Sequence, residues 1–378
     1  MREIPPVLGV HVFGPSYGES ILLQMPSEDG RADRWGIVDC CTLAESGNTS
    51  SVLPLEFLRL RGVQTLEFAC LTHPHEDHFR GFAKVLQAQD VAVRAWWRYG
   101  GDSHRTLEVY SRLRKRAKGA GDPEASNAFE ELLAIEKALR PLKRARDPSR
   151  FRRLSGYHPR LYGYKTQDGV ELRIAAFGPP ATHVQRYAEQ TAKELNFYVA
   201  ADGSESYVRL EKATRDLHNI VSVVLLVAFG SARVILGGDA DRRSWQLILG
   251  DTSRESQGDS LASTAVKVSH HGSKGSYCPA AWEAHSAQGP PYAVITPFPG
   301  LPRPEMLKEL GQVCSKVYLT GGPGRGMGRP RVKSKRLQMG EYGFTPHLAD
   351  LEGVVGYSLF FDASGRLFSE SPLAVKTQ

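Results

Sequence analysis

The chain has 378 residues, a net charge of +7 and 41% hydrophobic residues, which is enough apolar material for one large core. Its longest apolar stretch, Ile220–Phe229, is far shorter than the roughly 20 residues that cross a membrane, and its first residues lack the apolar segment of a signal peptide. We therefore expect a cytoplasmic protein with no membrane partner, whose five cysteines are buried or free thiols.

The first part of the chain, residues 8–83, alternates between strand and helix patterns. Two strands joined by a glycine turn are expected within residues 9–23, then a helix over 52–62 and a strand over 66–71. A further helix is expected to begin at Phe79 and to end before a strand over 91–99. This order is typical of an α/β protein.

The strand over 66–71 leads into the densest group of metal-ligand side chains in the chain. His73 and His75 lie two residues apart, so at a strand end they point the same way and could hold one cation. Asp77 and His78 follow and could hold a second cation. Two cations about 3.5–4 Å apart can share a hydroxide and clamp the oxygens of a displacement reaction. The alternative is a polar surface cluster without a metal.

Residues 103–160 hold fifteen Lys or Arg against seven Asp or Glu, and their charge of +8 accounts for the net charge of the chain. A helix after Asp122 is flanked by two basic runs. We interpret this segment as a basic helical insertion that caps the side of the reactive centre, although such runs are commonly solvated faces. Residues 324–336 form a second, glycine-rich basic loop. The basic side chains expected to contact a polyanion are Arg114, Lys115, Arg116, Lys143 and Arg144.

Later strands are expected over 170–177, 220–229, 233–236, 292–296, 316–320 and 353–361, with one more strand directly before His270. The strand over 233–236 ends in Gly-Gly-Asp239, and the strand before His270 ends in the pair His270-His271. In this order with the 73–78 cluster, these residues favour one reactive centre built from distant parts of the chain.

The motif His73-x-His75-x-Asp77-His78 resembles the signature of the metallo-β-lactamase superfamily. Residues 9–23 and 37–39 are similar to the opening strands of the hydrolase domain of bacterial DNA-uptake (competence) channel proteins, and Gly-Gly-Asp239 and His270-His271-Gly-Ser match its later motifs. The resemblance implies a four-layered αββα sandwich that spans residues 1–378 as a single elaborated domain.

The resemblance also implies two divalent metal ions, zinc first and manganese as the alternative, with Asp239 as the bridging ligand. It favours His271 as the ligand and His270 as its neighbour, although the sequence leaves that choice open. His218 stands 21 residues before Asp239 and is either a third ligand of the first metal or a polar residue at a strand start. Arg303 stands where these relatives have histidine, and it suits a phosphate oxygen.

These features predict a metal-dependent phosphodiesterase or nuclease that uses a metal-bridging hydroxide on DNA or RNA. Asp77 would orient the hydroxide, and His270 would stabilise the transition state or protonate the leaving oxygen. One alternative is a phosphodiesterase for a small molecule, such as a cyclic nucleotide or a phosphorylcholine-type ester. Another is a non-catalytic binding or signalling module. By analogy with the family, the chain could work with protein partners in a bacterial multi-protein system for DNA uptake or antiviral defence.

Overall fold

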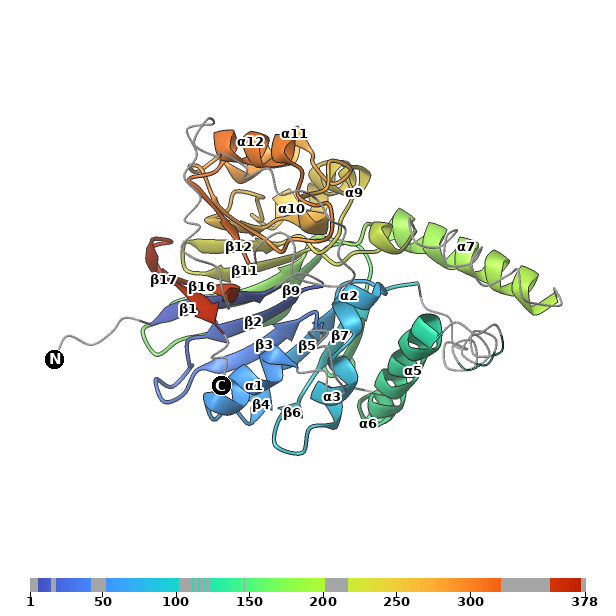
Figure 1. Ribbon diagram of the computed structural model, residues 1–378. Helices are drawn as coiled ribbons and strands as arrows, with labels where there is room; N and C mark the ends of the chain where they lie inside the picture. The colour runs from blue at the N-terminus through green and yellow to red at the C-terminus, as the bar shows by residue number, and fades with distance from the viewer. Residues whose placement is uncertain are drawn as a thin grey trace.

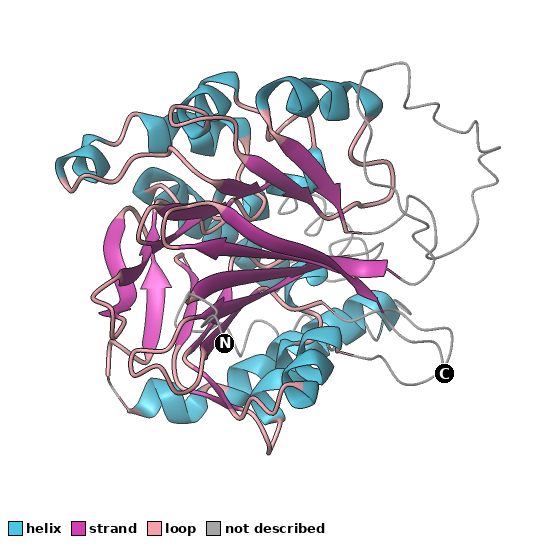
Figure 2. Ribbon diagram, turned by 90° about the vertical axis from the view of Figure 1, so that its left-hand side faces the viewer, coloured by secondary structure: helices cyan, strands magenta, loops and turns pink. Residues whose placement is uncertain are grey.

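Two large β-sheets lie face to face in the middle of the molecule, and helices cover their outer sides (Figures 1 and 2). This arrangement confirms the expected mixed α/β class. No helix of the described residues is long and apolar enough to cross a membrane. The computed structural model describes residues 6–14, 18–41, 52–101, 111, 115, 119, 123–145, 147–200, 217–320 and 354–374.

The first sheet has eight strands in the order β17-β16-β1-β2-β3-β5-β7-β8. Strands β3, β5, β7 and β8 run parallel to one another, so their carboxyl ends meet at one edge. All residues of β5 and β7 are buried, and β5 is a continuous apolar run, whereas β7 also holds the buried Arg98. The strands are β1 Val7–Phe13, β2 Ser20–Met25, β3 Arg34–Val38, β5 Phe68–Leu71, β7 Trp96–Tyr99, β8 Phe151–Leu154, β16 Val354–Asp362 and β17 Leu367–Ala374.

The second sheet has seven strands in the order β15-β14-β13-β12-β11-β10-β9, and β12 to β15 are parallel. Strands β8 and β9 follow each other in the chain but belong to different sheets, so residues 155–157 join the two sheets covalently. A separate short pair consists of β4 Thr65–Leu66 and β6 Ala92–Val93. The strands of the second sheet are β9 His158–Lys165, β10 Glu171–Ala176, β11 Leu225–Phe229, β12 Ala232–Leu236, β13 Ala265–Lys267, β14 Tyr292–Ile295 and β15 Lys316–Leu319.

Apolar side chains hold the helices to the sheets. Trp245, Trp282 and Leu310 belong to a buried cluster against the second sheet, and Leu58 and Phe82 belong to the cluster of the first sheet. All five cysteines are buried and unbridged, as expected. The helices are α1 Leu53–Leu60, α2 Glu76–Phe79, α3 Phe82–Gln87, α5 Pro123–Ala138, α6 Arg140–Arg144, α7 Ala181–Ala200, α9 Arg242–Leu249, α10 Thr252–Ser256, α11 Pro279–His285 and α12 Pro304–Val313.

The basic segment 103–160 is only partly the helical insertion that the sequence predicts. Helix α5 packs on α3, where the Glu131 carboxylate accepts the backbone N–H groups of Gly81 and Ala83 at 3.1 and 3.0 Å. From residue 151 onward the segment forms β8 and the start of β9, so the expected helical character through residue 160 was wrong. The arginines at 152 and 153 hid the strand, because they break its apolar alternation.

Two expected boundaries also differ. The helix predicted to begin at Phe79 is two short helices, because α2 begins at Glu76 and the chain turns at Gly81 before α3. Strand β11 begins at Leu225 rather than at Ile220. The preceding residues bind the metal-ligand loop instead, with the Val223 N–H donating to the Thr72 carbonyl at 3.0 Å. The basic loop 324–336 lies outside the described residues.

Candidate metal centre

The candidate ligands lie where parallel strands of both sheets end. Asp39 follows β3 and the 73–78 loop follows β5, whereas Asp239 follows β12 and the histidine pair 270–271 follows β13. Side chains from the carboxyl ends of parallel strands meet at one edge of a sheet. Residues from distant parts of the chain therefore converge, as the sequence predicts.

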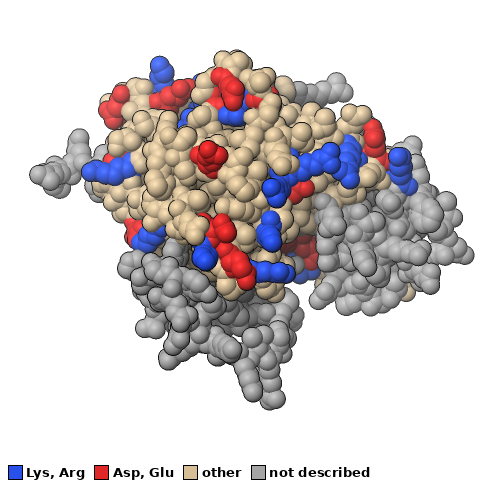
Figure 3. Space-filling model, turned by 90° about the horizontal axis from the view of Figure 1, so that it is seen from above, with Lys and Arg blue, Asp and Glu red and all other residues tan. Residues whose placement is uncertain are grey.

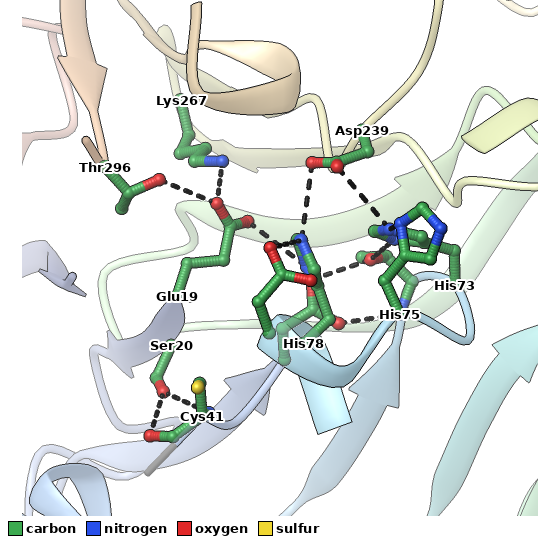
Figure 4. A network of polar contacts seen from close by, with 12 residues as sticks. Glu19, Ser20, Cys41, His73, His75, His78, Asp239, Lys267 and Thr296 are labelled. Carbon is green, nitrogen blue, oxygen red and sulfur yellow. Dashed lines mark hydrogen bonds and ion pairs between the residues drawn. The ribbon is translucent and has the colours of Figure 1, made fainter. Parts of the chain in front are cut away.

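One group of ligand atoms consists of His73, His75 and Asp239, all within 4.8 Å of one another. His73 Nε2 lies 3.0 Å from His75 Nδ1 and 3.5 Å from Asp239 Oδ2 (Figure 4). The ring of His218 lies 5.0 Å from that of His75, centroid to centroid. These contacts place His218 beside the first group, where a third imidazole could reach the same cation.

A second group of ligand atoms within 4.8 Å of one another consists of Glu19, His78, Asp239 and His271. His78 Nε2 lies 3.6 Å from Asp77 Oδ2 and 3.4 Å from Asp239 Oδ1. His271 Nε2 lies 3.0 Å from Asp77 Oδ2. His78 Nε2 and Asp239 Oδ1 are buried and have no hydrogen-bond partner. Asp239 therefore reaches both groups, as a bridging ligand would.

Hydrogen bonds fix the imidazoles of this second group so that Nε2 faces the centre. His78 Nδ1 lies 2.8 Å from Asp39 Oδ2, and His271 Nδ1 lies 2.8 Å from the carbonyl oxygen of Thr296. Both oxygens accept, so each ring carries a proton on Nδ1 and turns its Nε2 toward the carboxylates of the centre. Metal-binding histidines are almost always held by such outer partners.

The glycines beside the ligands allow close backbone approach. Gly238 has φ +49°, and a Cβ there would lie 2.9 Å from Ser222 Oγ. That same hydroxyl accepts the Asp239 N–H at 2.8 Å and contacts His73 Nδ1 at 3.2 Å. The Gly-Gly-Asp turn thus lets one serine orient two candidate ligands.

Backbone strain is concentrated in the same place. Among the described residues, three non-glycine residues have positive φ: Asp39 at 54°, His270 at 49° and His271 at 53°. Non-glycine residues adopt this region at a cost, and such outliers gather at functional sites. All three belong to the candidate centre, so its geometry is maintained against local backbone preference.

Negative charge exceeds positive charge among the buried side chains. The carboxylates of Asp39, Asp77 and Asp239 form no ion pair with a Lys or Arg of the described residues, whereas Glu19 pairs with the buried Lys267. Burial raises the pKa of Asp39, but His78 and hydrogen bonds of 2.8 and 2.7 Å from the Thr72 N–H and hydroxyl oppose that rise. Buried carboxylates are costly without nearby positive charge, which protonated histidines or divalent cations would supply.

The pKa values of His73 and His78 are shifted in opposite directions. Burial lowers the pKa of His73 well below its usual value. Burial also opposes a proton on His78, but the carboxylates of Asp239 and Asp77 raise its pKa well above the usual value. Burial likewise opposes ionisation of Asp239, yet His78 and His73 hold its pKa well below its usual range. A proton on His78 therefore supplies positive charge where a cation could lie.

His270 differs from the other histidines because its side chain is 32% exposed and its Nε2 lies 3.9 Å from Asp239 Oδ2. It stands at the mouth of the centre, whereas His271 is buried in it. Arg303 is exposed at the start of α12, directly after Pro302, which lies against Gly272. This geometry favours His271 as ligand and leaves His270 within reach of a bound substrate.

Three of the five basic residues expected to contact a polyanion, Lys115, Lys143 and Arg144, belong to the described part of the chain. Arg114 and Arg116 lie outside the described residues, and Lys115 and Arg144 are exposed. Lys143 forms an ion pair with Glu136, which also pairs with the buried Arg98. Lys143 thus ties α6 to the first sheet, a structural role that the sequence did not predict.

Sequence reasoning missed the residues that orient the ligands. Glu19 lies with Oε1 3.7 Å from His78 Nδ1, and Thr296 donates its hydroxyl hydrogen to Glu19 Oε2 at 2.8 Å (Figure 4). Lys267 was visible as a charged residue inside an apolar strand pattern, and Glu19 as one directly before such a strand. Buried charges of this kind are almost always paired or bound to metal, and this was the available signal.

No family model matches the chain, and no curated protein matches it either. Two buried groups of His, Asp and Glu side chains could hold metal ions.

Proposed function

We propose that this chain is a metallo-β-lactamase-type αββα hydrolase that cleaves phosphodiester bonds of DNA or RNA with two divalent cations. The observation that carries the proposal is the convergence of His73, His75, His78 and His271 around Asp239. Three buried atoms there, Glu19 Oε1, His78 Nε2 and Asp239 Oδ1, lack a hydrogen-bond partner. Zinc suits imidazole and carboxylate ligands, and manganese is the alternative.

The residues divide the work between the two groups. His73, His75 and His218 would hold one cation, and Asp77, His78 and His271 the other, with Asp239 between them. Bound cations would supply a hydroxide nucleophile at neutral pH and would neutralise charge on the phosphoryl oxygens.

The side chains around the cations would carry out the proton transfers. Asp77 Oδ2 faces both His78 and His271, so it is placed to accept a hydrogen bond from an attacking water. His270 is the accessible imidazole, so it is the residue that can protonate a leaving oxygen. The buried remainder of the centre would exclude bulk water from the ligands.

Metal analysis and turnover of a small diester test this proposal. Purified protein is expected to retain about two zinc or manganese ions per chain and to hydrolyse bis(p-nitrophenyl) phosphate, DNA and RNA, whereas Asp77→Ala should lose at least about 100-fold in kcat. His158→Ala, a histidine outside the centre, is the control and should keep full activity. Full nuclease activity in Asp77→Ala would reject the mechanism, and a chain that holds no metal would favour a binding module.

A further inference from the structure

Three segments beside the candidate metal centre meet at its rim. Helix α7 contacts the start of α9, because His183 Nδ1 lies 3.1 Å from Ser244 Oγ. The start of α9 contacts the loop after the histidine pair, because the Arg242 N–H donates to the Gly275 carbonyl at 2.9 Å. Since α9 begins three residues after Asp239, this junction adjoins the ligands.

The junction carries four exposed cations, which we call the rim cluster: Arg186, Arg242, Arg243 and Lys274. None of them has a carboxylate within 4.0 Å among the described residues. Figure 3 shows Lys and Arg side chains in a band on the right of the upper face, the side toward which α7 extends in Figure 1. Unpaired cations gathered beside a reactive centre favour an anionic partner.

The acidic groups near the rim cluster are already engaged. Asp241 caps α9 by accepting the Ser244 N–H at 2.7 Å, and Glu189 accepts a hydrogen bond from Gln185 at 2.9 Å. The charged groups of the four rim residues therefore face solvent. By contrast, the Lys143 ammonium of the basic insertion is paired with Glu136.

We propose that the rim cluster binds the phosphates of a nucleic-acid strand whose scissile bond lies at the metal centre. This inference rests on the proposed function and identifies the surface that selects a polymer over a small diester. Arginine and lysine contacts to phosphate give affinity without base specificity, and each contact releases counterions. Because the rim cluster adjoins the candidate ligands, it is expected to supply more of the salt-dependent affinity than the exposed cations of α5 and α6.

A salt titration of the metal-loaded protein tests the inference. Binding of a fluorescent, phosphorothioate-substituted oligonucleotide is followed by anisotropy at several salt concentrations. The test variant replaces three rim residues: Arg242→Ala, Arg243→Ala and Lys274→Ala. The slope of the logarithm of the association constant against the logarithm of the salt concentration should become less steep by about 2–3, because each phosphate contact contributes about 0.7–0.9. Turnover of bis(p-nitrophenyl) phosphate should stay unchanged, since none of the three contacts the candidate ligands with its side chain.

The matched control removes the same charge from the insertion, with Lys137→Ala, Arg140→Ala and Arg144→Ala, all exposed on α5 and α6. It should leave the slope within about 0.5 of wild type. Equal losses in both triple variants, or no loss in the rim variant, overturn the inference. If the protein hydrolyses the small diester but does not bind oligonucleotides, the inference about the rim cluster is wrong and the proposed phosphodiesterase activity is supported. The protein could also bind oligonucleotides through the rim cluster in a salt-dependent way but hydrolyse no diester. That outcome supports the role of the rim cluster and refutes the proposed hydrolase function.

Discussion

Asp39 is the residue whose replacement tests the metal centre most sharply, because it touches a candidate ligand without being one. Its Oδ2 accepts from His78 Nδ1 at 2.8 Å and from the Thr72 hydroxyl at 2.7 Å, and its Oδ1 accepts the Thr72 N–H at 2.8 Å. Asparagine has the same shape and tolerates the positive φ of this position. Asp39→Asn therefore changes the chemistry of the contact and keeps its geometry.

In the variant, the asparagine oxygen keeps the bond to the Thr72 N–H, and its NH₂ group then faces His78 Nδ1. Two donors cannot share that contact, so His78 moves its proton to Nε2, the atom that faces the centre. Loss of an outer-sphere partner costs about 10–100-fold in metal affinity, which corresponds to about 1.4–2.8 kcal/mol. We expect zinc affinity to fall by that factor.

The assay is competition for zinc against a chromophoric chelator, with thermal unfolding of the metal-free protein measured alongside. Asp259→Asn is the matched control, because Asp259 is equally buried but pairs with Arg173 and accepts a hydrogen bond from Tyr157. It should lower stability and leave zinc affinity unchanged. Wild-type zinc affinity in Asp39→Asn would refute the idea that this carboxylate orients a ligand.

Three further outcomes are expected. His271→Ala should lose about one metal per chain by elemental analysis, whereas His270→Ala should keep its metal and lose about 100-fold or more in kcat; the reverse pattern would exchange their roles. Chelation should lower the midpoint of thermal unfolding. Zinc at about 1,000 times its dissociation constant should restore about 4 kcal/mol of the free energy of unfolding. An unchanged midpoint would contradict a stabilising bound metal. Burial lowers the pKa of His285 to about 4. The unfolded chain therefore binds a proton on His285 from about pH 6.5 downward, whereas the folded chain does not until about pH 4. The free energy of unfolding of wild type, measured by urea unfolding, should fall by about 3 kcal/mol relative to that of His285→Asn between about pH 6.5 and 4. An equal pH dependence of the two proteins would contradict this.

The sequence locates the candidate ligands well because they lie within short motifs that follow apolar strands. The strand before the 73–78 loop, the Gly-Gly-Asp turn and the histidine pair could all be located from periodicity and residue type. The joining of these motifs into one centre depends on strand order across two sheets, which the resemblance implied and periodicity alone does not contain.

The orienting residues could not be predicted in the same way. Asp39, Thr296 and Ser222 act through contacts that span tens to hundreds of residues, and each is an ordinary polar residue in its local sequence. Helix α7 was missed although its residues are amphipathic. Strand β8 was missed because arginines occupy its middle positions, and there tertiary packing overrides the local pattern.

The covalent link at residues 155–157 limits how this molecule can admit a substrate. Because neighbouring strands on either side of it hydrogen-bond into separate sheets, swinging the two halves apart would strip backbone hydrogen bonds from an edge of one sheet or the other. Hinge opening of the kind seen in two-lobed proteins is therefore disfavoured. A ligand of the candidate centre would then be admitted from the surface beside the exposed His270.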